Sequence, residues 1–315
     1  MRYCFGIDIG GTTVKIGLFD QKGEMVTRWE VPTRKSSDPA GLLGDVKISL
    51  EDCMVERKID KADILGIGMT APGPVTADGV LHNAVNIGWG AVKLAEEAEK
   101  IIGISPVRIG NDARVAALGE AAFGAGKGAK SMLMVTLGTG VGGGVVLNGK
   151  ILMGESGVAG EIGHMTIDPY ETETCGCGKK GCLEQYASAT GMVRVAERFL
   201  QESTEDSVLR QLEKVTAKDL WDAAKAGDRL ADEITDFVCD RLGSAIANAI
   251  YLVDTERIVI GGGVSAAGQF LLDKVETAYN GKVFVHSRNK KFALAELGND
   301  AGIMGAAALI LQTVE

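Results

Sequence analysis

The stretch YCFGIDIGGTTVKIGLFD, residues 3–20, decides the fold, because its pattern predicts a β-hairpin. Residues 3–9 are rich in β-branched and aromatic side chains and end at a Gly-Gly pair, and a second run of this kind covers residues 14–19. A third run, residues 25–31, follows the next turn, so the pattern predicts a three-stranded meander.

The same pattern starts again at residue 131. SMLMVTL, residues 131–137, leads into a Gly/Thr turn and then into VGGGVVL, residues 141–147, which closes at the hairpin signal Asn148-Gly149. Two copies of one hairpin indicate a duplicated core with one copy in each domain. Chance similarity in a glycine-rich chain is the alternative.

The composition is that of a globular protein of about two domains, since the chain has 315 residues. The 33 basic and 42 acidic residues give a net charge of −9, which argues against broad binding to nucleic acid or to anionic membranes. The 43 glycines follow no collagen period, so we expect them at tight turns or where backbone closely approaches another group. We expect no export signal and no membrane span, and the six cysteines do not resemble a disulfide framework, so a cytoplasmic location is expected.

Helices and strands alternate along the rest of the chain, which predicts an α/β fold. The remaining strands are expected at 64–69, 107–110 and 257–260, and the helices at 41–57, 92–102, from Asn111-Asp112, over much of 182–253, up to Tyr279 and from Ala301.

The turn of the first hairpin carries groups that bind phosphate. Gly10 and Gly11 leave room for backbone N–H groups to point outward, and Thr12 and Thr13 add hydroxyl donors. Asp8, just behind the turn, is a carboxylate that can hold Mg²⁺. A tight hairpin beside an unrelated acid is the alternative.

The turn of the second hairpin has the same chemistry at Gly138, Thr139 and Gly140. Strands gain nothing from such glycines unless backbone must approach a ligand closely. The cluster Gly261-Gly262-Gly263 offers a flat surface for adenine or ribose, or it is a plain strand-to-helix turn.

Asn111-Asp112 follows a predicted strand and begins a helix. A helix N-cap is the ordinary role of such a pair. At a strand end in a cleft, however, one carboxylate can accept the proton of a substrate hydroxyl during phosphoryl transfer.

The spacing of Cys175, Cys177 and Cys182, with His164 upstream, predicts a closed tetrahedral zinc site of the structural kind. Free thiols or disulfides are the alternative.

Five motifs occur in a fixed order: Asp8-Ile-Gly-Gly-Thr12, Asn111-Asp112, LGTGVGGG, Glu161-Ile-Gly-His164 and CGCGKKGCLE. Together they resemble the ROK family of bacterial sugar kinases and sugar-responsive repressors over essentially the whole chain, and its glucokinases most of all. The resemblance implies a two-domain actin-like and hexokinase-like (ribonuclease H-like) fold with an interdomain cleft. We expect a small domain of residues 1–112 and 300–315 and a large domain of 113–299 that carries the zinc loop.

The resemblance also implies roles for individual residues. Asp112 would be the catalytic base, and His164 would bind both sugar and zinc. The residues expected to bind sugar are Gly73, Asn86, Asn111, Asp112, Glu161, His164 and Glu184. Those expected to bind the nucleotide with its Mg²⁺ are Asp8, Gly10, Gly11, Thr12, Thr13, Lys15, Gly138, Thr139, Gly140, Gly261, Gly262 and Gly263.

The function implied is ATP-dependent phosphorylation of the 6-hydroxyl of a hexose, with glucose favoured over N-acetylmannosamine, allose or fructose. A non-catalytic repressor is disfavoured, because the first strand begins at Tyr3 and leaves no room for a recognition helix. An actin-like structural protein or ATPase is disfavoured because in the family the zinc loop serves sugar binding. Family members are commonly homodimers or homotetramers.

Overall fold

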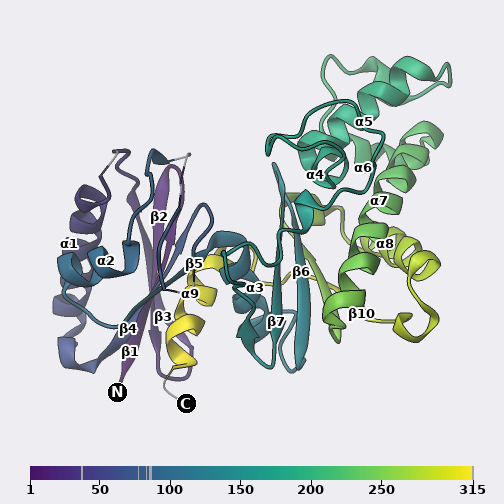
Figure 1. Cartoon of the computed structure of the whole chain (residues 1–315). Helices are drawn as coiled ribbons and strands as arrows, with labels where there is room; N and C mark the ends of the chain where they lie inside the picture. Colours follow the sequence, from purple (N-terminus) through teal and green to yellow (C-terminus); the bar gives the residue numbers. More distant parts are fainter. Residues whose placement is uncertain (37, 77, 83, 85–86, 314–315) are drawn as a thin grey trace. The chain divides into compact units, whose positions relative to one another are not determined.

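The computed structural model describes residues 1–36, 38–76, 78–82, 84 and 87–313. They form two compact units (Figure 1). Unit 1 comprises Met1–Gly128, Val146–Ala159 and Leu297–Glu315, and unit 2 comprises Ala129–Val145 and Gly160–Glu296. The α/β class predicted from the sequence is confirmed.

Ten strands lie within the described residues: β1 Tyr3–Ile9, β2 Thr13–Asp20, β3 Met25–Pro32, β4 Ile64–Ala71, β5 Val107–Asn111, β6 Ser131–Leu137, β7 Val141–Leu147, β8 Lys150–Ile151, β9 Arg257–Gly261 and β10 Lys291–Leu294. The α-helices there are α1 Ala40–Arg57, α2 Leu94–Ile102, α3 Asp112–Phe123, α4 Glu184–Ala187, α5 Ala189–Glu202, α6 Ala217–Lys225, α7 Arg229–Val253, α8 Gln269–Lys282 and α9 Ala301–Leu311. Short 3-10 helices include η3 Ile162–His164, η5 Gly263–Ala267 and η7 Gly298–Asp300.

The two sheets have the same strand order, which agrees with the expected duplication. One runs β3-β2-β1-β4-β5 and the other β8-β7-β6-β9-β10. In the first, β1, β4 and β5 are parallel and β2 and β3 are antiparallel to their neighbours. In the second, β9 is parallel to both β6 and β10. The carboxyl ends of β1, β4 and β5 therefore meet at one edge of the first sheet.

The first sheet lies between two layers of helices (Figure 1). Alternate residues of β1, namely Phe5, Ile7 and Ile9, belong to the core that contains the buried side chains of α1 and α2. Cys4 points to the opposite face and packs with Ile303 of α9. Side chains alternate between the two faces of a strand, so Asp8, four residues after Cys4, lies on the same face as Cys4 and points toward α9.

Glycine allows α9 to lie directly on the sheet and on α3. A Cβ atom on Gly68 of β4 would stand 1.7 Å from the carbonyl oxygen of Ala306, and one on Gly305 would stand 1.8 Å from that of Val115. No side chain larger than hydrogen fits at such distances. The expectation that many glycines serve close backbone approach is confirmed at these two positions.

In unit 2, α7 packs along α8, and α8 packs against β10. The hairpin signal Asn148-Gly149 is confirmed as a turn in which both residues have positive φ, 50° and 74°. The strand β10 lies at a sheet edge and was not predicted.

The predicted domain boundaries, after residue 112 and before residue 300, stay predictions. The compact units have different bounds, because α3 lies in unit 1, where it packs closely against α9.

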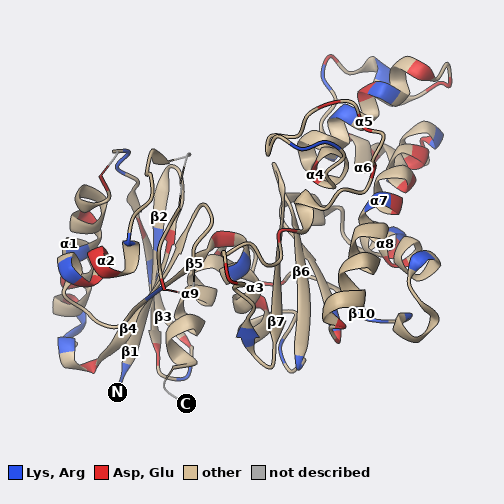
Figure 2. Cartoon of the chain, in the orientation of Figure 1, with Lys and Arg blue, Asp and Glu red and all other residues tan. Residues whose placement is uncertain are grey.

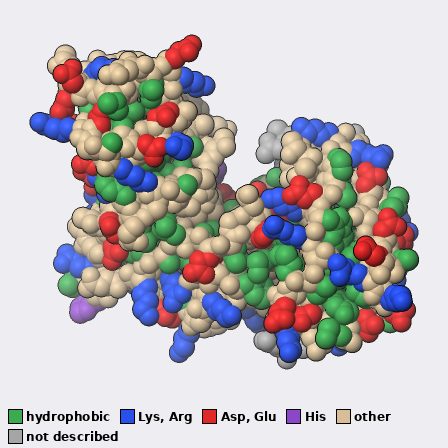
Figure 3. All heavy atoms as spheres, turned by 180° about the vertical axis from the view of Figure 1, so that it is seen from behind, with side chains coloured by type: hydrophobic (Ala, Val, Ile, Leu, Met, Phe, Trp, Pro, Cys, Tyr) green, Lys and Arg blue, Asp and Glu red, His purple; other side chains and the backbone are tan. Residues whose placement is uncertain are grey.

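Charged side chains of both signs alternate along α1, α2, α7 and α8 (Figure 2). The same mixture covers the face shown in Figure 3. Among the described residues, no helix has the length and apolar character needed to cross a membrane.

Candidate active site and metal centre

Three polar side chains meet at the carboxyl edge of the first sheet. Asp8 lies opposite Thr70 in the register of β1 and β4, and Asn111 ends the neighbouring strand β5. The hydroxyl of Thr70 donates to Oδ1 of Asp8. A Cβ on Gly302, at the start of α9, would stand 2.6 Å from Oδ2 of Asp8, so only glycine admits the carboxylate there. Ligands of α/β sheets bind at such an edge.

Asp112 follows directly as the first residue of α3. Its Oδ1 accepts a hydrogen bond of 2.8 Å from the backbone N–H of Ala113. The pKa of Asp112 is raised, mainly because surrounding protein atoms displace hydration, and the charge of Asp8 adds to the effect. The N–H of Ala113, Asn111 and the charge of Arg114 oppose the rise. The side chain nevertheless remains exposed, so a substrate hydroxyl can reach it.

Asn111 performs the capping role and leaves Asp112 available. Its Oδ1 accepts from the N–H of Arg114 at 3.3 Å, as an N-cap does. Its amide nitrogen donates to the carbonyl oxygen of Gly73 at 3.1 Å. Two of the predicted sugar-binding residues, Asn111 and Gly73, are thus in contact. A third, Asn86, lies outside the described residues.

The turn between β1 and β2 is fixed by backbone hydrogen bonds. The N–H of Gly10 donates to the carbonyl of Thr13 at 3.0 Å, and the N–H of Thr33 donates to that of Thr12 at 2.9 Å. A Cβ on Gly11 would meet no heavy atom within 4 Å, so open space lies beside this residue. Lys15, predicted to bind nucleotide, donates instead to the carbonyl of Asn299 at 3.2 Å.

The matching turn in unit 2 is held by the start of α5. The N–H of Ala189 donates to the carbonyl of Gly138 at 2.8 Å, and the hydroxyl of Thr190 donates to that of Thr139 at 2.9 Å. A Cβ on Gly138 would have only one neighbour, the carbonyl oxygen of Gly140 at 3.9 Å. The turn is therefore rigid and still accessible at Gly138.

A cavity of about 620 Å³ opens beside this turn within unit 2. Of the predicted nucleotide-binding residues, Gly138, Thr139 and Gly263 line it. Gly262 is required by the fold, because its φ is +83° and a Cβ would stand 2.5 Å from the carbonyl oxygen of Leu137. Gly261 packs against Met134 and is not among the lining residues.

One wall of this cavity was not predicted. It is the start of α6, including Thr216, Lys218 and Trp221. Thr216 and Asp219 form a reciprocal capping box, which is the one signal in the sequence that marks this helix end. Nothing in the sequence pattern alone brings it to the Gly138 turn.

Glu161 precedes η3 and His164 is its last residue, and this short helix rests on the beginning of β7. A Cβ on Gly163 would stand 2.0 Å from the carbonyl oxygen of Val141. Glu184 reaches the same place, because its Oε2 accepts from the N–H of Val141 at 2.9 Å. The three predicted sugar-binding residues of unit 2 therefore gather around one strand end.

The predicted zinc ligands also come together. One ligand atom from each of His164, Cys175, Cys177 and Cys182 lies within 4.8 Å of the other three. The Sγ atoms of Cys177 and Cys182 are 3.6 Å apart, close to the roughly 3.8 Å separation of two thiolates on one tetrahedral zinc. The Nδ1 atom of His164 is buried and has no hydrogen-bond partner in the described chain. This orphaned nitrogen and the sulfur spacing fit a metal ion.

Without a cation, Cys175 and Cys182 favour the protonated thiol over the thiolate. Burial and the neighbouring thiols raise the pKa of Cys182 to about 12. Burial also raises the pKa of Cys175. Several thiolates so close together require positive charge between them.

The cysteine loop, residues 171–182, is held in place by an ion pair between Glu171 and Arg194. The side chain of Glu171 is 4% exposed and accepts from Arg194 at 2.8 Å and from the hydroxyl of Tyr186 at 2.7 Å. Burial alone would raise the pKa of Glu171, but these hydrogen bonds outweigh it and lower the pKa to about 2. Glu171 therefore stays ionised and ties the loop to α4 and α5.

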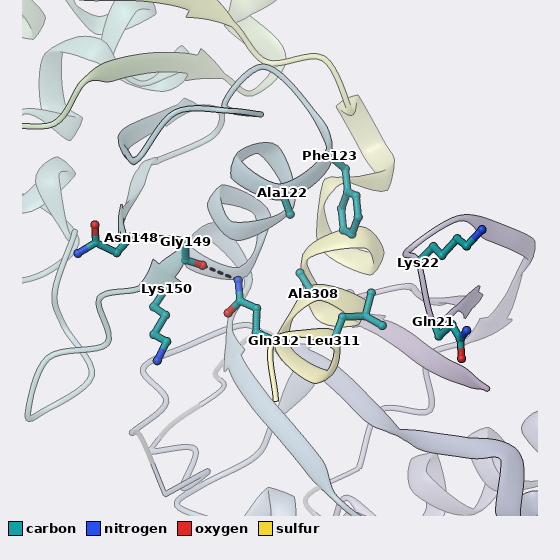
Figure 4. A pocket seen from close by; sticks show the side chains of 10 residues that line it. All are labelled: Gln21, Lys22, Ala122, Phe123, Asn148, Gly149, Lys150, Ala308, Leu311 and Gln312. Carbon is teal, nitrogen blue, oxygen red and sulfur yellow. Dashed lines mark hydrogen bonds between the residues drawn. The ribbon is translucent and has the colours of Figure 1, made fainter. Parts of the chain in front are cut away.

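A second cavity, of about 640 Å³, lies within unit 1 (Figure 4). It is lined by the last turns of α3 and α9 and by the turns after β2 and β7, including Phe123, Leu311, Lys22 and Lys150. None of the predicted site residues lines it. Since Asp112 is at the other end of α3, about 16 Å along the helix, this cavity cannot hold a sugar on which Asp112 acts.

Comparison with known proteins finds similarity over nearly the whole chain. The sequence profile of the ROK family matches residues 4–313. A glucokinase of Halalkalibacterium halodurans is 43% identical over 316 residues, which cover 99% of this chain and 96% of that protein.

Two solved structures are also similar to this chain over nearly its full length. The crystal structure of a ROK hexokinase from Thermus thermophilus covers 99% of both chains with a TM-score of 0.84 at 31% identity. A ROK family glucokinase from Streptomyces griseus, crystallised with glucose and AMPPNP, covers 98% of this chain and 99% of its own with a TM-score of 0.76 at 31% identity.

Proposed function

The chain belongs to the ROK family, and from this premise we propose that it is a hexose kinase that transfers the γ-phosphoryl group of ATP to the 6-hydroxyl of glucose. Its similarity to glucokinases over nearly the full length supports glucose as the substrate. The actin-like two-domain fold of the hexokinases is the fold of this chain.

The observation that carries the proposal is the position of Asp112. Its carboxylate is accessible, stands at the carboxyl edge of β1, β4 and β5, and has a raised pKa that makes it a better proton acceptor. Asp112 takes the proton of the 6-hydroxyl, the oxygen bonds to the γ-phosphorus, and the bond from that phosphorus to the β,γ-bridging oxygen breaks to release ADP. Asn111 and Gly73 orient the sugar beside it.

The nucleotide occupies the cavity beside the Gly138 turn in unit 2. Gly138, Thr139 and Gly263 give its backbone walls, and Trp221 gives it an apolar side suited to a purine. The Mg²⁺ that accompanies ATP neutralises phosphate charge. In unit 1, Asp8 and the turn from Gly10 to Thr13 are the groups assigned to the metal and the phosphates.

The sugar is recognised in unit 2 by Glu161, His164 and Glu184. Matched hydrogen bonds to hydroxyl groups discriminate strongly, because the wrong sugar leaves buried polar groups unpaired. Asn86 would contribute to the same recognition.

We assign zinc to His164, Cys175, Cys177 and Cys182. A closed set of three sulfur ligands and one nitrogen is structural, so the ion would hold the cysteine loop in place and leave the reaction to the acids. His164 would bind zinc through Nδ1, the orphaned atom, and keep its other ring nitrogen for the sugar.

We also propose that the protein is a cytoplasmic homodimer or homotetramer with no nucleic-acid or membrane partner. None of the six cysteines forms a disulfide, which fits a reducing compartment. The exposed apolar side chains of Tyr251, Leu252, Phe284 and Val285 in unit 2 are suited to an interface between copies. Light scattering during size-exclusion chromatography measures the oligomeric state.

The test of the proposed function is a panel of hexoses with ATP and Mg²⁺, read by a coupled assay for ADP. Glucose should give the highest kcat/KM, and N-acetylmannosamine, allose and fructose should give lower values. A preference for one of the other sugars would transfer the assignment to that sugar. No turnover with any of them would contradict the kinase assignment.

A further inference from the structure

Two side chains beside the zinc site, Gln185 and Lys179, bind the segments that carry its four ligands. We infer that Gln185 and Lys179 are positioning residues of this site and that they increase its affinity for zinc. The inference rests on the proposed zinc assignment. Both residues and all four ligands belong to unit 2.

Gln185 lies in α4 and closes the cysteine loop at its neck. Its Oε1 accepts from the N–H of Cys182 at 3.1 Å, and its Nε2 donates to the carbonyl oxygen of Glu173 at 3.1 Å. Glu173 precedes the first cysteine of the loop, and Cys182 is the last one. One amide group therefore joins the two ends of the stretch that contains all three sulfur ligands.

The backbone of Gln185 is itself held by hydrogen bonds. Its N–H donates to the carbonyl oxygen of Cys182 at 3.0 Å, and its carbonyl oxygen accepts from Nε of Arg194 at 3.2 Å. The same guanidinium donates from Nη1 to Oε2 of Glu173 at 2.9 Å. Because none of these hydrogen bonds uses a sulfur atom or an imidazole nitrogen, the network leaves the ligand atoms available for a metal ion.

Lys179 connects the fourth ligand to the same loop. Its Nζ donates to the carbonyl oxygen of His164 at 3.0 Å. Its own carbonyl oxygen accepts from the N–H of Cys175 at 2.7 Å. Lys179 is thus bonded both to the segment that carries the nitrogen ligand and to a residue that supplies a sulfur ligand, so it helps to set the distance between them.

The placement of ligands affects zinc affinity because a closed tetrahedral site needs all four ligand atoms in a narrow range of positions. Ordering a flexible loop around the ion would cost conformational entropy and weaken binding. A loop that is already closed by Gln185 and tied to His164 by Lys179 loses less entropy. Residues that orient metal ligands in this way contribute roughly 10- to 100-fold to metal affinity.

Lys180 provides a matched control for Lys179. The two lysines are adjacent, exposed and equally charged, so either cation can offset the net negative charge of three thiolates and one Zn²⁺. Within the described chain, the Nζ of Lys180 makes no hydrogen bond or ion pair. Comparing Lys179→Gln with Lys180→Gln therefore separates the hydrogen bond to His164 from the effect of charge.

Gln269→Leu provides the control for Gln185→Leu. The second variant removes both hydrogen bonds of the Gln185 side chain and nearly conserves its volume. Gln269 also uses its Nε2 in a short hydrogen bond, to Oδ1 of Asp273 at 2.7 Å, but it lies at the start of α8 and outside the cysteine loop.

The experiment measures the affinity of each full-length variant for Zn²⁺ by competition with a chromophoric chelator, a readout that needs no kinase activity. We expect Gln185→Leu to bind zinc about 10- to 100-fold more weakly than wild type, and Gln269→Leu to equal wild type. Lys179→Gln should lose about three- to tenfold, a smaller effect because Lys179 is exposed. Lys180→Gln should lose less than about twofold.

Two further readouts distinguish positioning from general destabilisation. Lys179→Arg keeps a cationic donor and should retain most of the zinc affinity. With zinc saturating, the KM for sugar should rise in Lys179→Gln and the KM for ATP should stay constant, because His164 is assigned to the sugar and does not line the nucleotide cavity. Lys179→Gln also tests the inference if Gln185→Leu does not fold, since the side chain of Lys179 is exposed.

Wild-type zinc affinity in both Gln185→Leu and Lys179→Gln would overturn the inference. An equal loss in Lys179→Gln and Lys180→Gln would overturn the role of the hydrogen bond to His164, because charge alone would then explain the loss. Failure of the zinc assignment is a different result, since wild type would then bind no zinc. Failure of the kinase assignment would instead be seen as a lack of turnover with every sugar in the panel.

Discussion

The replacement Asp112→Asn removes the proposed proton acceptor and little else. The hydrogen bond from the N–H of Ala113 to Oδ1 can pass to the amide oxygen of asparagine. The N-cap of α3 is Asn111, so the helix keeps its capping bond. Sugar binding through Asn111 and Gly73 should be retained.

The expected loss in kcat is roughly 10²- to 10⁴-fold, the usual contribution of a general base. At about 1.4 kcal/mol for each factor of ten, this corresponds to about 3 to 5 kcal/mol of the activation barrier. The KM for sugar should change by less than a factor of about three, because the group acts on the transition state.

Although Asp112→Asn should lower kcat, it should increase the stability of the folded protein. The pKa of Asp112 is higher in the folded protein than in the unfolded chain, so its ionisation costs stability as pH rises through the unfolded value. Asp112→Asn removes that cost and should raise Tm at pH 7. The difference should vanish below about pH 3, where aspartate is protonated in both states.

The assays are steady-state kinetics with coupled ADP detection and thermal unfolding at pH 7 and pH 3. A variant with near wild-type turnover would remove Asp112 from the role of base. A lower Tm at pH 7 would contradict the raised pKa and show that Asp112 has a structural role.

Three further predictions concern the nucleotide, the metal and the loop. Gly138→Val should raise the KM for ATP at least tenfold with little change in Tm, since a Cβ there meets only ordinary contacts; an unchanged KM would mean that the turn is only structural. Metal analysis should find about one zinc per chain, lost together with sugar affinity in Cys177→Ser; a metal-free, fully active protein would contradict the zinc assignment. Because the pKa of Glu171 is lowered to about 2, its contribution to stability is complete above its unfolded value and lost as pH falls from there toward 2. In Glu171→Gln the stability should be lower at pH 7 and less dependent on pH between 5 and 2, and an unchanged pH profile of Tm would show that the ion pair is not formed.

The hairpins were predictable from sequence because each signal was local. The apolar run of residues 3–9 and its glycine turn occupy adjacent positions, and Asn148-Gly149 favours one type of turn whatever surrounds it. The cysteine cluster was equally predictable, since three of its four members lie within eight residues.

What the sequence did not predict depends on contacts between distant segments. The strand β10 has the sequence KFAL and pairs with β9 alone, so it lacks the long apolar run of a central strand. The wall that α6 adds to the cavity beside the Gly138 turn looks in sequence like any capped helix. Glu120 stands among alanines in α3, and only the fold brings Leu297 to its carboxylate.

A crystal structure of this protein with glucose and AMPPNP tests the proposed chemistry most directly. The sugar's O6 should lie within hydrogen-bond reach of a carboxylate oxygen of Asp112, about 2.6 to 3.2 Å, and on line with the γ-phosphorus. An O6 that instead contacts another acid, with Asp112 turned away from the sugar, would contradict the account.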